Sequence, residues 1–383
     1  FYALLKTKGA RHEMKFTCPK PEFLSAIGAV SKAIASKPQT PILSGIYLRA
    51  EGNQLELQAT DYEIGIIYQL EADIEEPGQL VLSGRYLQEV VRRLPSDTVR
   101  VSYDSQEKIT HIQGGNANYT LRSMNASEYP GVHRLEGDLR FTLKDNLLRS
   151  LFKKTVFACS NDESRPVFTG VNMDIDDTSI TLAGTNTHRL AVKKTVLETS
   201  VGTMKLIIPA KTLNELLHIL TSEVPSDVEI TCSFNQISFQ YENIYLTGRL
   251  IEGAFPSFAN VIPKNATTCV TMDTAELIAA MDRVYLISRT GDYNVVKLSF
   301  ADGNLHISSS NPDIGMAEEN IPVDIEGPGL DIAFNAAYLV DALKVLESER
   351  CTFALTKPLA PVLVTEPDDP DFIYVVTPMR TAH

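Results

Sequence analysis

The sequence lacks several features that mark common protein classes. It has no run of about 20 apolar residues, so no segment is suited to cross a membrane as a helix. Its five cysteines are odd in number, widely spread and form no CxxC pair. This pattern indicates reduced cytoplasmic thiols and argues against a disulfide framework or a zinc site. No Pro-rich or low-complexity tract interrupts the chain, so we expect folded domains in a cytoplasmic protein.

Motifs of catalysis are lacking as well. The histidines form no HxxxH or HExxH pair, Gly114-Gly115 has no GK[ST] ending of a phosphate loop, and no GxSxG sequence occurs. His188 is the tempting residue, because Arg189 follows it and Asn186 is near. Without a supporting motif, we predict that the protein is not an enzyme and uses no metal or other cofactor.

An excess of positive charge is also absent, since the formal net charge is -13. A protein that grips nucleic acid over its whole surface should be basic. The distribution of charge weakens this argument against nucleic-acid binding, because acidic residues gather in predicted turns and strands while basic residues gather on predicted helices. A solvated helix surface is the alternative explanation, but six helices with one bias favour a shared positive face. The basic residues are Lys32, Lys37, Arg85, Arg92, Arg93, Lys144, Arg149, Lys153, Lys154, Lys211, Arg283, Arg289 and Lys344.

An apolar helical stripe occurs three times at one spacing. Each stripe has residues at i, i+3, i+4 and i+7, which lie on one side of a helix. Three stripes in phase at a domain-sized interval predict three copies of one unit. The stripes are Leu87, Val90, Val91 and Leu94; then, 126 residues later, Leu213, Leu216, Leu217 and Leu220; and after another 126, Leu339, Ala342, Leu343 and Leu346.

Each repeat also has an earlier helix and several alternating apolar and polar stretches typical of half-buried strands. The earlier helices carry Phe23, Leu148 and Leu277. The order is strand, helix, three strands, twice per repeat, which predicts an α+β fold. We expect a leader at 1–13 ahead of a natural start at Met14, and domains at 14–137, 138–265 and 266–383. The predicted strands are 46–49, 55–59, 65–70 and 99–103; 171–175, 179–183, 190–194 and 228–232; and 296–300, 305–309, 316–321 and 352–355.

Four short motifs carry a resemblance to a known family. They are Met14-Lys15-Phe16-Thr17, the segment 184–192 (GTNTHRLAV), Gly253-Ala254-Phe255-Pro256 and the segment 375–380 (VVTPMR). Together with the threefold repeat, and in this order, the chain resembles the bacterial sliding clamps, the β subunits of DNA polymerase III. The resemblance runs from Met14 to Arg380.

The resemblance implies a homodimeric ring of six domains, with helices lining a pore and a continuous sheet outside. Such a ring encircles duplex DNA without reading its sequence and gives processivity to the replicative polymerase. Positive helices would face the phosphates, and an acidic exterior would repel the rest of the duplex. Residues matching the family's pore positions are Lys37, Arg85 and Lys211, with Arg165 near by. A solvated surface charge is the alternative for each.

The resemblance also implies a peptide-binding pocket between the second and third repeats, used by the polymerase, the clamp loader and other proteins with a clamp-binding motif. Val, Leu, Pro and Met would make an apolar cleft, and Arg189 and Arg380 would hold polar peptide groups at its rim. The matching residues are Phe168, Thr185, Thr187, His188, Arg189, Leu190, Pro256, Val261, Leu359, Pro361, Val375, Val376, Pro378, Met379 and Arg380.

Some positions depart from the family pattern. Ala259 and Asn260 stand where basic residues are frequent, Thr377 stands where Met is frequent, and 381–383 extend past the usual end. At the ring seam, the matching residues are Tyr119, Leu121, Leu286 and Ile287, for which ordinary core positions are the alternative. A peptide-binding scaffold that never meets nucleic acid is the remaining alternative function. It would share the pocket but would not need basic helices.

Overall fold

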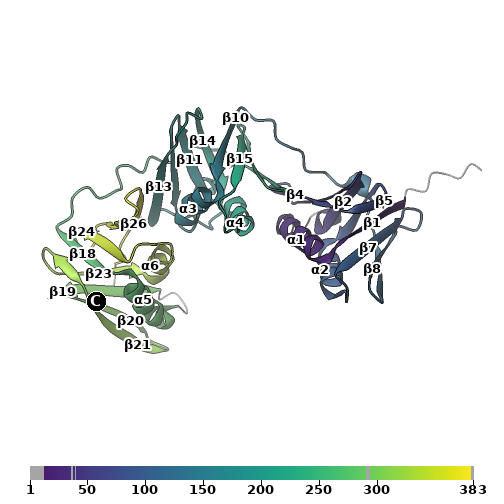
Figure 1. Ribbon diagram of the computed structural model, residues 1–383. Coiled ribbons are helices and arrows are strands. Elements are labelled where there is room, and N and C mark those ends of the chain that lie inside the picture. The colour runs from purple at the N-terminus through teal and green to yellow at the C-terminus, as the bar shows by residue number, and fades with distance from the viewer. Residues whose placement is uncertain (1–12, 36–37, 39, 290–293, 381–383) are drawn as a thin grey trace, which may run out of the picture. The chain divides into compact units, whose positions relative to one another are not determined.

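The computed structural model describes residues 13–35, 38, 40–289 and 294–380, and it contains three domains of one design (Figure 1). Each domain has a strand, a helix and three strands, and then the same series again, as predicted. Short extra strands, β5 and β22, interrupt the first and third domains.

The first domain consists of β1 (Glu13–Pro19), α1 (Lys20–Val30), β2 (Gly45–Glu51), β3 (Gln54–Thr60), β4 (Ile64–Glu71), β5 (Asp73–Glu76), β6 (Gly78–Ser83), α2 (Gly84–Arg93), β7 (Thr98–Asp104), β8 (Ile109–Gly114) and β9 (Ala117–Arg122). The second consists of β10 (Leu139–Lys144), α3 (Asp145–Val156), β11 (Gly170–Asp176), β12 (Ser179–Thr185), β13 (Arg189–Val196), β14 (Thr203–Pro209), α4 (Ala210–Ile219), β15 (Asp227–Cys232), β16 (Gln236–Tyr241) and β17 (Ile244–Arg249). The third consists of β18 (Thr268–Asp273), α5 (Thr274–Ser288), β19 (Val295–Ala301), β20 (Asn304–Asn311), β21 (Gly315–Pro322), β22 (Asp324–Glu326), β23 (Leu330–Asn335), α6 (Ala336–Leu343), β24 (Arg350–Leu355), β25 (Val362–Thr365) and β26 (Phe372–Val376).

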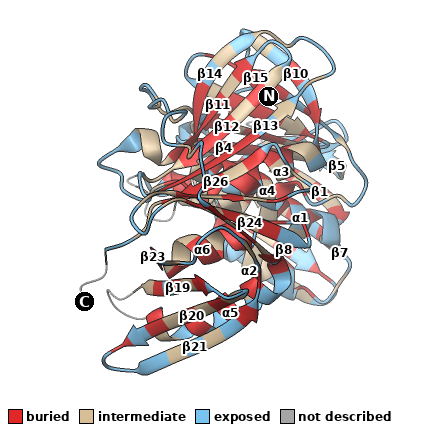
Figure 2. Ribbon diagram, turned by 90° about the vertical axis from the view of Figure 1, so that its left-hand side faces the viewer, coloured by how far each residue is buried: buried red, intermediate tan, exposed pale blue. Residues whose placement is uncertain are grey.

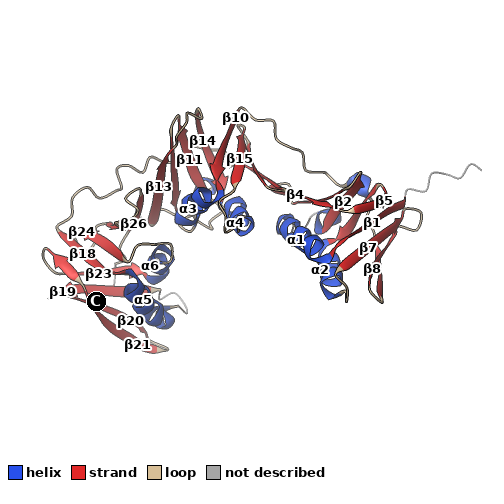
Figure 3. Ribbon diagram, in the orientation of Figure 1, coloured by secondary structure: helices blue, strands red, loops and turns tan. Residues whose placement is uncertain are grey.

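The helices form because their apolar stripes can be buried against the sheets. Of the twelve stripe residues, all but Val90 and Leu217 are buried. Local chemistry agrees with the helix starts, since the Asp273 carboxylate accepts the Glu276 N–H at 2.7 Å and Pro21 stands in the first turn of α1. Figure 3 shows α1 beside α2, and α5 beside α6, each pair on one side of its own strands.

Two sheets run across domain boundaries. An eight-stranded sheet has the order β10-β15-β16-β17-β4-β3-β2-β6, and a nine-stranded sheet has the order β14-β11-β12-β13-β26-β25-β24-β18-β22. The boundary pairs are therefore β17 with β4 and β26 with β13, both antiparallel. The remaining strands form β5-β1-β7-β8-β9 and β21-β20-β19-β23. In the described part of the chain, β9 and β21 each end a sheet with one side unpaired.

These shared sheets divide the chain into two compact units. Unit 1 comprises Phe1–Asp145 and His218–Arg249, and unit 2 comprises Asn146–Leu217 and Leu250–His383. The middle domain is split between them, because β15 to β17 join the sheet of the first domain while β11 to β14 join that of the third. None of the helices among the described residues combines the length and the apolar character needed to cross a membrane.

Burial differs between strands (Figure 2). In β26, Phe372, Tyr374 and Val376 are fully buried in the core of the third domain. In β21 by contrast most side chains are exposed or half-buried. All five cysteines are free thiols, and burial raises the pKa of Cys18 and Cys232 to about 12.

Candidate functional site: a cleft in unit 2

A cleft of about 360 Å³ lies where β13 of the second domain pairs with β26 of the third, inside unit 2. Ten of the fifteen predicted pocket residues line it: Phe168, Thr185, Thr187, His188, Arg189, Leu190, Pro256, Val261, Pro361 and Val375. These residues come from five separate segments of the sequence, and the β13–β26 ladder joins two of them. Leu190 lies directly opposite Val375 in that ladder.

One wall is a tight turn between β12 and β13. The Asn186 side-chain oxygen accepts the N–H groups of His188 and Arg189, both at 3.0 Å, and Thr187 has φ = 77°. The Thr185 hydroxyl donates to the Arg189 carbonyl at 2.6 Å and accepts the Thr187 N–H at 3.1 Å. Because side chains satisfy the backbone groups of the turn, the turn holds one shape at the mouth of the cleft.

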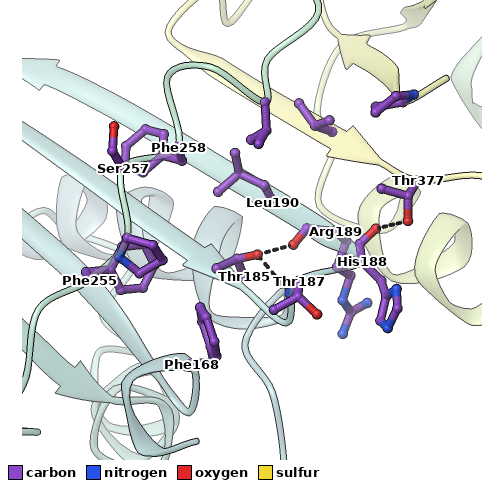
Figure 4. A pocket seen from close by; sticks show the side chains of 14 residues that line it. Phe168, Thr185, Thr187, His188, Arg189, Leu190, Phe255, Ser257, Phe258 and Thr377 are labelled. Carbon is purple, nitrogen blue, oxygen red and sulfur yellow. Dashed lines mark hydrogen bonds between the residues drawn. The ribbon is translucent and has the colours of Figure 1, made fainter.

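The opposite wall is aromatic. Phe255 lies edge-on to both Phe168 and Phe258, with ring centroids 6.4 Å apart in each pair. Phe255 and Phe258 also pack on the apolar cluster that contains Leu190 and Val375. Figure 4 shows Leu190 between these rings and the His188–Thr377 side of the cleft. An apolar side chain entering the cleft would therefore meet aromatic and aliphatic surface on several sides.

The polar side of the cleft is fixed by Thr377. Its N–H and its hydroxyl both donate to the His188 carbonyl, at 2.9 and 3.0 Å. Thr377 is one of four lining residues outside the predicted set. The others are Phe255, Ser257 and Phe258. The Phe-Pro motif named Phe255 in the sequence, but only the fold shows that its ring, and that of Phe258, turn toward β13.

Five predicted pocket residues lie outside the cleft: Leu359, Val376, Pro378, Met379 and Arg380. Val376 is fully buried, because successive residues of a strand face opposite sides and Val375 faces the cleft. Met379 is held elsewhere by its N–H, which donates to the Ala333 carbonyl of β23 at 2.7 Å.

Arg189 lines the cleft, but its guanidinium points away from the aromatic wall (Figure 4), and its role at the rim stays a prediction. Its guanidinium pairs with Asp341 at 2.7 Å, donates to the Phe157 carbonyl at 2.5 Å and lies 4.5 Å from the centre of the Tyr338 ring. Only 9 % of the residue is exposed. Arg189 therefore ties β13 to α6 behind the cleft.

A buried ionic cluster lies at the same domain boundary. The Lys154 ammonium of α3 lies 2.5 Å from carboxylate oxygens of both Glu366 and Asp369, and Lys193 of β13 also pairs with Asp369. Lys154 and Glu366 are almost completely buried. Burial alone would raise the pKa of Glu366, but the Lys154 ammonium and the N–H groups of Ser348 and Glu347 outweigh it and lower that pKa.

This cluster corrects the predicted positive helix face. Lys154 is enclosed in the core, so it adds no charge to the surface of α3. Several other helix cations are exposed but paired: Arg92 and Arg93 with Glu89, Lys153 with Glu347, Arg283 with Glu319, and Lys344 with Asp282. The net positive bias of the helices is thus smaller than the sequence count indicated.

The predicted DNA-facing residues lie in different settings. Arg85 is exposed in the first turn of α2, and Lys211 is exposed in the first turn of α4. Lys37 lies outside the described residues. Arg165 pairs with Asp162 at 3.1 Å and stacks over Phe168 at 5.5 Å, beside the cleft. Hydrogen bonds from Ser164 and Arg165 lower the pKa of Asp162.

The predicted seam residues lie on the unpaired strand β9 and on α5, the helix that packs against the other unpaired strand, β21. Tyr119 is 37 % exposed and Leu121 half-buried on β9, while Leu286 is 62 % exposed and Ile287 half-buried at the end of α5. Exposed apolar side chains beside an unpaired strand are typical of an interface.

Comparison with known proteins matches nearly the whole chain to one family. Models of the DNA polymerase III beta subunit match residues 14–133 (N-terminal domain), 142–257 (central domain) and 259–380 (C-terminal domain). The beta sliding clamp of Bacillus subtilis (strain 168) is 35 % identical over 379 residues, which is 96 % of this chain and 100 % of that protein. The beta sliding clamp of Staphylococcus aureus (strain N315) is 32 % identical over 377 residues, again 96 % and 100 %.

Solved structures agree. The DNA polymerase sliding clamp of Bacillus subtilis has a TM-score of 0.90 at 33 % identity, covering 97 % of this chain and 100 % of that one. The DNA polymerase III beta chain of Streptococcus pneumoniae TIGR4 has a TM-score of 0.89 at 30 % identity, covering 96 % and 100 %.

Proposed function

This chain belongs to the DNA polymerase III beta subunit family, the bacterial sliding clamps, and from this premise we propose how its residues carry out clamping. It is a non-catalytic DNA sliding clamp. Two subunits join head to tail into a ring around duplex DNA in the cytoplasm, and the cleft in unit 2 takes linear peptides of the polymerase, the clamp loader and other partners. The observation that carries the proposal is the pair of matched free edges, β9 and β21.

The two boundaries inside the chain indicate how those edges pair. At each boundary, the last strand of the later domain pairs with the fourth strand of the earlier one: β17 with β4, and β26 with β13. The same rule leaves the last strand of the first domain, β9, and the fourth full strand of the third, β21. A second subunit therefore supplies the missing neighbour for each, which closes a ring of six domains.

The register of the proposed seam, that is, which residues of β9 and β21 lie opposite each other, follows from the repeat. Tyr119, Leu246 and Tyr374 are equivalent, because each ends the same cross-strand row of its domain. Ile66, Ala191 and Ala317 are equivalent by their partners Ala59, Gly184 and Ser309, which lie 125 residues apart. Leu246 lies opposite Ile66, and Tyr374 lies opposite Ala191. The proposed seam thus places Tyr119 opposite Ala317 of the partner subunit. The three rows are Phe16-Val101-Ile112-Tyr119, Phe141-Ile230-Phe239-Leu246 and Val270-Phe353-Val364-Tyr374.

The helix residues of the seam follow the same logic. Helices α3 and α5 begin 129 residues apart, at Asp145 and Thr274, so Phe157 and Ala158 correspond to Leu286 and Ile287. At the inner boundary the Phe157 ring lies 5.7 Å from the Tyr374 ring, and Ala158 is fully buried in the same core. Leu286 should accordingly pack on Tyr119 of the partner subunit.

Binding to DNA needs no base contact in this arrangement. Exposed Arg85 and Lys211, together with Lys37, would meet phosphates from the helix side, and a closed ring cannot leave a circle. The test is to load the protein on nicked circular DNA, wash, and then linearise the DNA with a restriction enzyme. Retention on circles and release from the cut DNA are expected. Equal retention on both would show ordinary binding and overturn the ring.

For the cleft, we propose a short peptide with Leu and Phe anchors. The walls formed by Phe168, Phe255 and Phe258 and the floor formed by Leu190 and Val375 suit apolar side chains. A labelled peptide should bind with a dissociation constant in the micromolar range, about -8 kcal/mol. Fluorescence polarisation measures this. A Leu190→Asp variant that remains dimeric in sedimentation should lose binding, and unchanged affinity would place the peptide elsewhere.

A further inference from the structure

The turn that shapes the cleft recurs in the first domain. There the Asp61 carboxylate accepts the N–H groups of Glu63 and Ile64 at 3.0 and 2.9 Å, and the Thr60 hydroxyl donates to the Ile64 carbonyl at 2.9 Å. Tyr62 has φ = 75°, close to the 77° of Thr187. The backbone frame of the cleft is therefore shared by the first two domains.

A cavity recurs with the turn. In unit 1, about 640 Å³ of space lies beside this second turn, lined partly by the linker segment 131–136. The apolar part of this cavity is already filled by the linker. Gly65 stands where the cleft has Leu190, and Val132 of the linker packs on it so closely that a Cβ on Gly65 would lie 2.9 Å from a Val132 methyl carbon. The linker thus occupies the place of an apolar ligand at this boundary.

The third domain also has a turn at the matching place beside the free edge β21, but this turn is one residue longer and has Pro312 where the cleft turn has Thr187. The Asn311 side-chain oxygen accepts the Asp313 N–H at 2.9 Å, and Asn311 is buried. Here Ile314 ends the turn and Met316 stands in the position of Leu190. They are 51 % and 62 % exposed. Met316 points away from the helix core, because its neighbour Ala317 packs against that core.

Ring closure would place a strand of the partner subunit beside this turn. In the register derived above, Thr120 of the partner subunit lies opposite Met316, as Val375 lies opposite Leu190 in the cleft. Arg122 of the partner subunit then takes the position of Thr377. The two linkers between domains serve the two inner boundaries, so no linker equivalent to Phe255 or Val132 spans the seam between subunits.

We propose that dimer closure builds a second peptide site at each seam, lined by Ile314 and Met316 of one subunit and by Thr120 and Arg122 of the partner subunit. It takes an apolar side chain of the same class of linear peptide as the cleft. Methionine adapts its shape to different ligands, and Arg122 can pair with a peptide carboxylate. The site rests on the proposed ring. It lacks the three phenylalanine rings of the cleft, so it binds at least tenfold more weakly.

The test is calorimetric titration of the full-length dimer with the Leu- and Phe-containing peptide, continued to high peptide concentration. Two classes of site per chain are expected. Met316→Asp should abolish the weak class and leave the strong class unchanged, and Ile314→Asp should do the same. The matched control is Val196→Asp, since Val196 is 81 % exposed on β13 and outside both sites. Sedimentation of each variant checks that it is still a dimer.

A dissociated chain provides the second arm. Monomers of a Leu286→Ala, Ile287→Ala variant, obtained by dilution, should keep the strong class and lose the weak one. A wild-type dimer that is retained on circular DNA but shows one class of site would overturn this inference while the proposed ring stands. A weak class that survives Met316→Asp and Ile314→Asp in a dimer would overturn it too. A wild-type chain that never dimerises would overturn the ring itself.

Discussion

Removing the apolar side chains at the end of α5 should separate the ring into subunits. We predict that Leu286→Ala with Ile287→Ala shifts the monomer–dimer equilibrium strongly toward monomer. Truncating a buried Leu or Ile to Ala costs about 2–5 kcal/mol. Both residues lie at the edge of a core, so the lower end applies, and each seam should lose about 4 kcal/mol. That loss weakens each seam about a thousandfold.

Because dissociation into monomers breaks both seams at once, the two losses add, and the dimerisation constant should fall by up to about a millionfold. Sedimentation velocity over a dilution series measures it. Phe234→Ala is the matched control, since Phe234 is 86 % exposed at the hairpin between β15 and β16 and lies on neither free edge. Circular dichroism checks that the variant is folded. A double variant as dimeric as wild type at every concentration would refute the equivalence of Leu286 with Phe157.

Three further predictions test other parts of the argument. Tyr119→Cys with Ala317→Cys should form an intersubunit disulfide on mild oxidation, seen in a non-reducing gel, whereas moving the second cysteine one residue along β21 turns it to the other face and should prevent the bond. Lys154→Met should destabilise unit 2 by about 3–5 kcal/mol in urea unfolding, because it leaves buried carboxylates unpaired. In the wild type, folding lowers the pKa of Glu366. The stability that Glu366 contributes is therefore present above its unfolded pKa and should disappear as the pH falls through its folded pKa. Phe255→Ala should weaken peptide binding in fluorescence polarisation by about 3 kcal/mol or more with no loss of the dimer, and an unchanged affinity would contradict the aromatic wall.

Most of the fold could be predicted because the repeat reinforces weak local signals. An apolar stripe such as that of Leu213 to Leu220 is ambiguous alone, but three stripes 126 residues apart select helices in one design. The alternating strands were equally clear, and β2, β3, β11, β12, β19 and β20 enclose the predicted ranges. The short strands β5 and β22 were missed, because three or four residues carry too little pattern to separate them from a turn.

The cleft could be predicted only in part. The resemblance supplied the segments, and the β13–β26 ladder explains why Leu190 and Val375 meet. Whether a side chain points into the cleft could not be predicted from its neighbour in the sequence. Val376 follows Val375 but faces the core, and Arg189 follows His188 but turns back to Asp341. Likewise, the sequence around Lys154 looks like that of an exposed helix lysine. Its burial depends on Glu366 and Asp369, more than 200 residues away in the sequence.

The corresponding strand and turn have three different outcomes in one chain, and the residues around them decide which. Where Leu190 stands and aromatic rings of the linker line the wall, the frame leaves an open apolar cleft. Where Gly65 stands, Val132 fills the space. Where Met316 stands, its own strand β21 has one side unpaired in the described part of the chain, and we propose that a second subunit covers it. The strand register is the same at the two inner boundaries, and we propose that it also holds between subunits. Different residues at the position of Leu190 then separate a binding site from a closed joint and from a joint that can form between molecules.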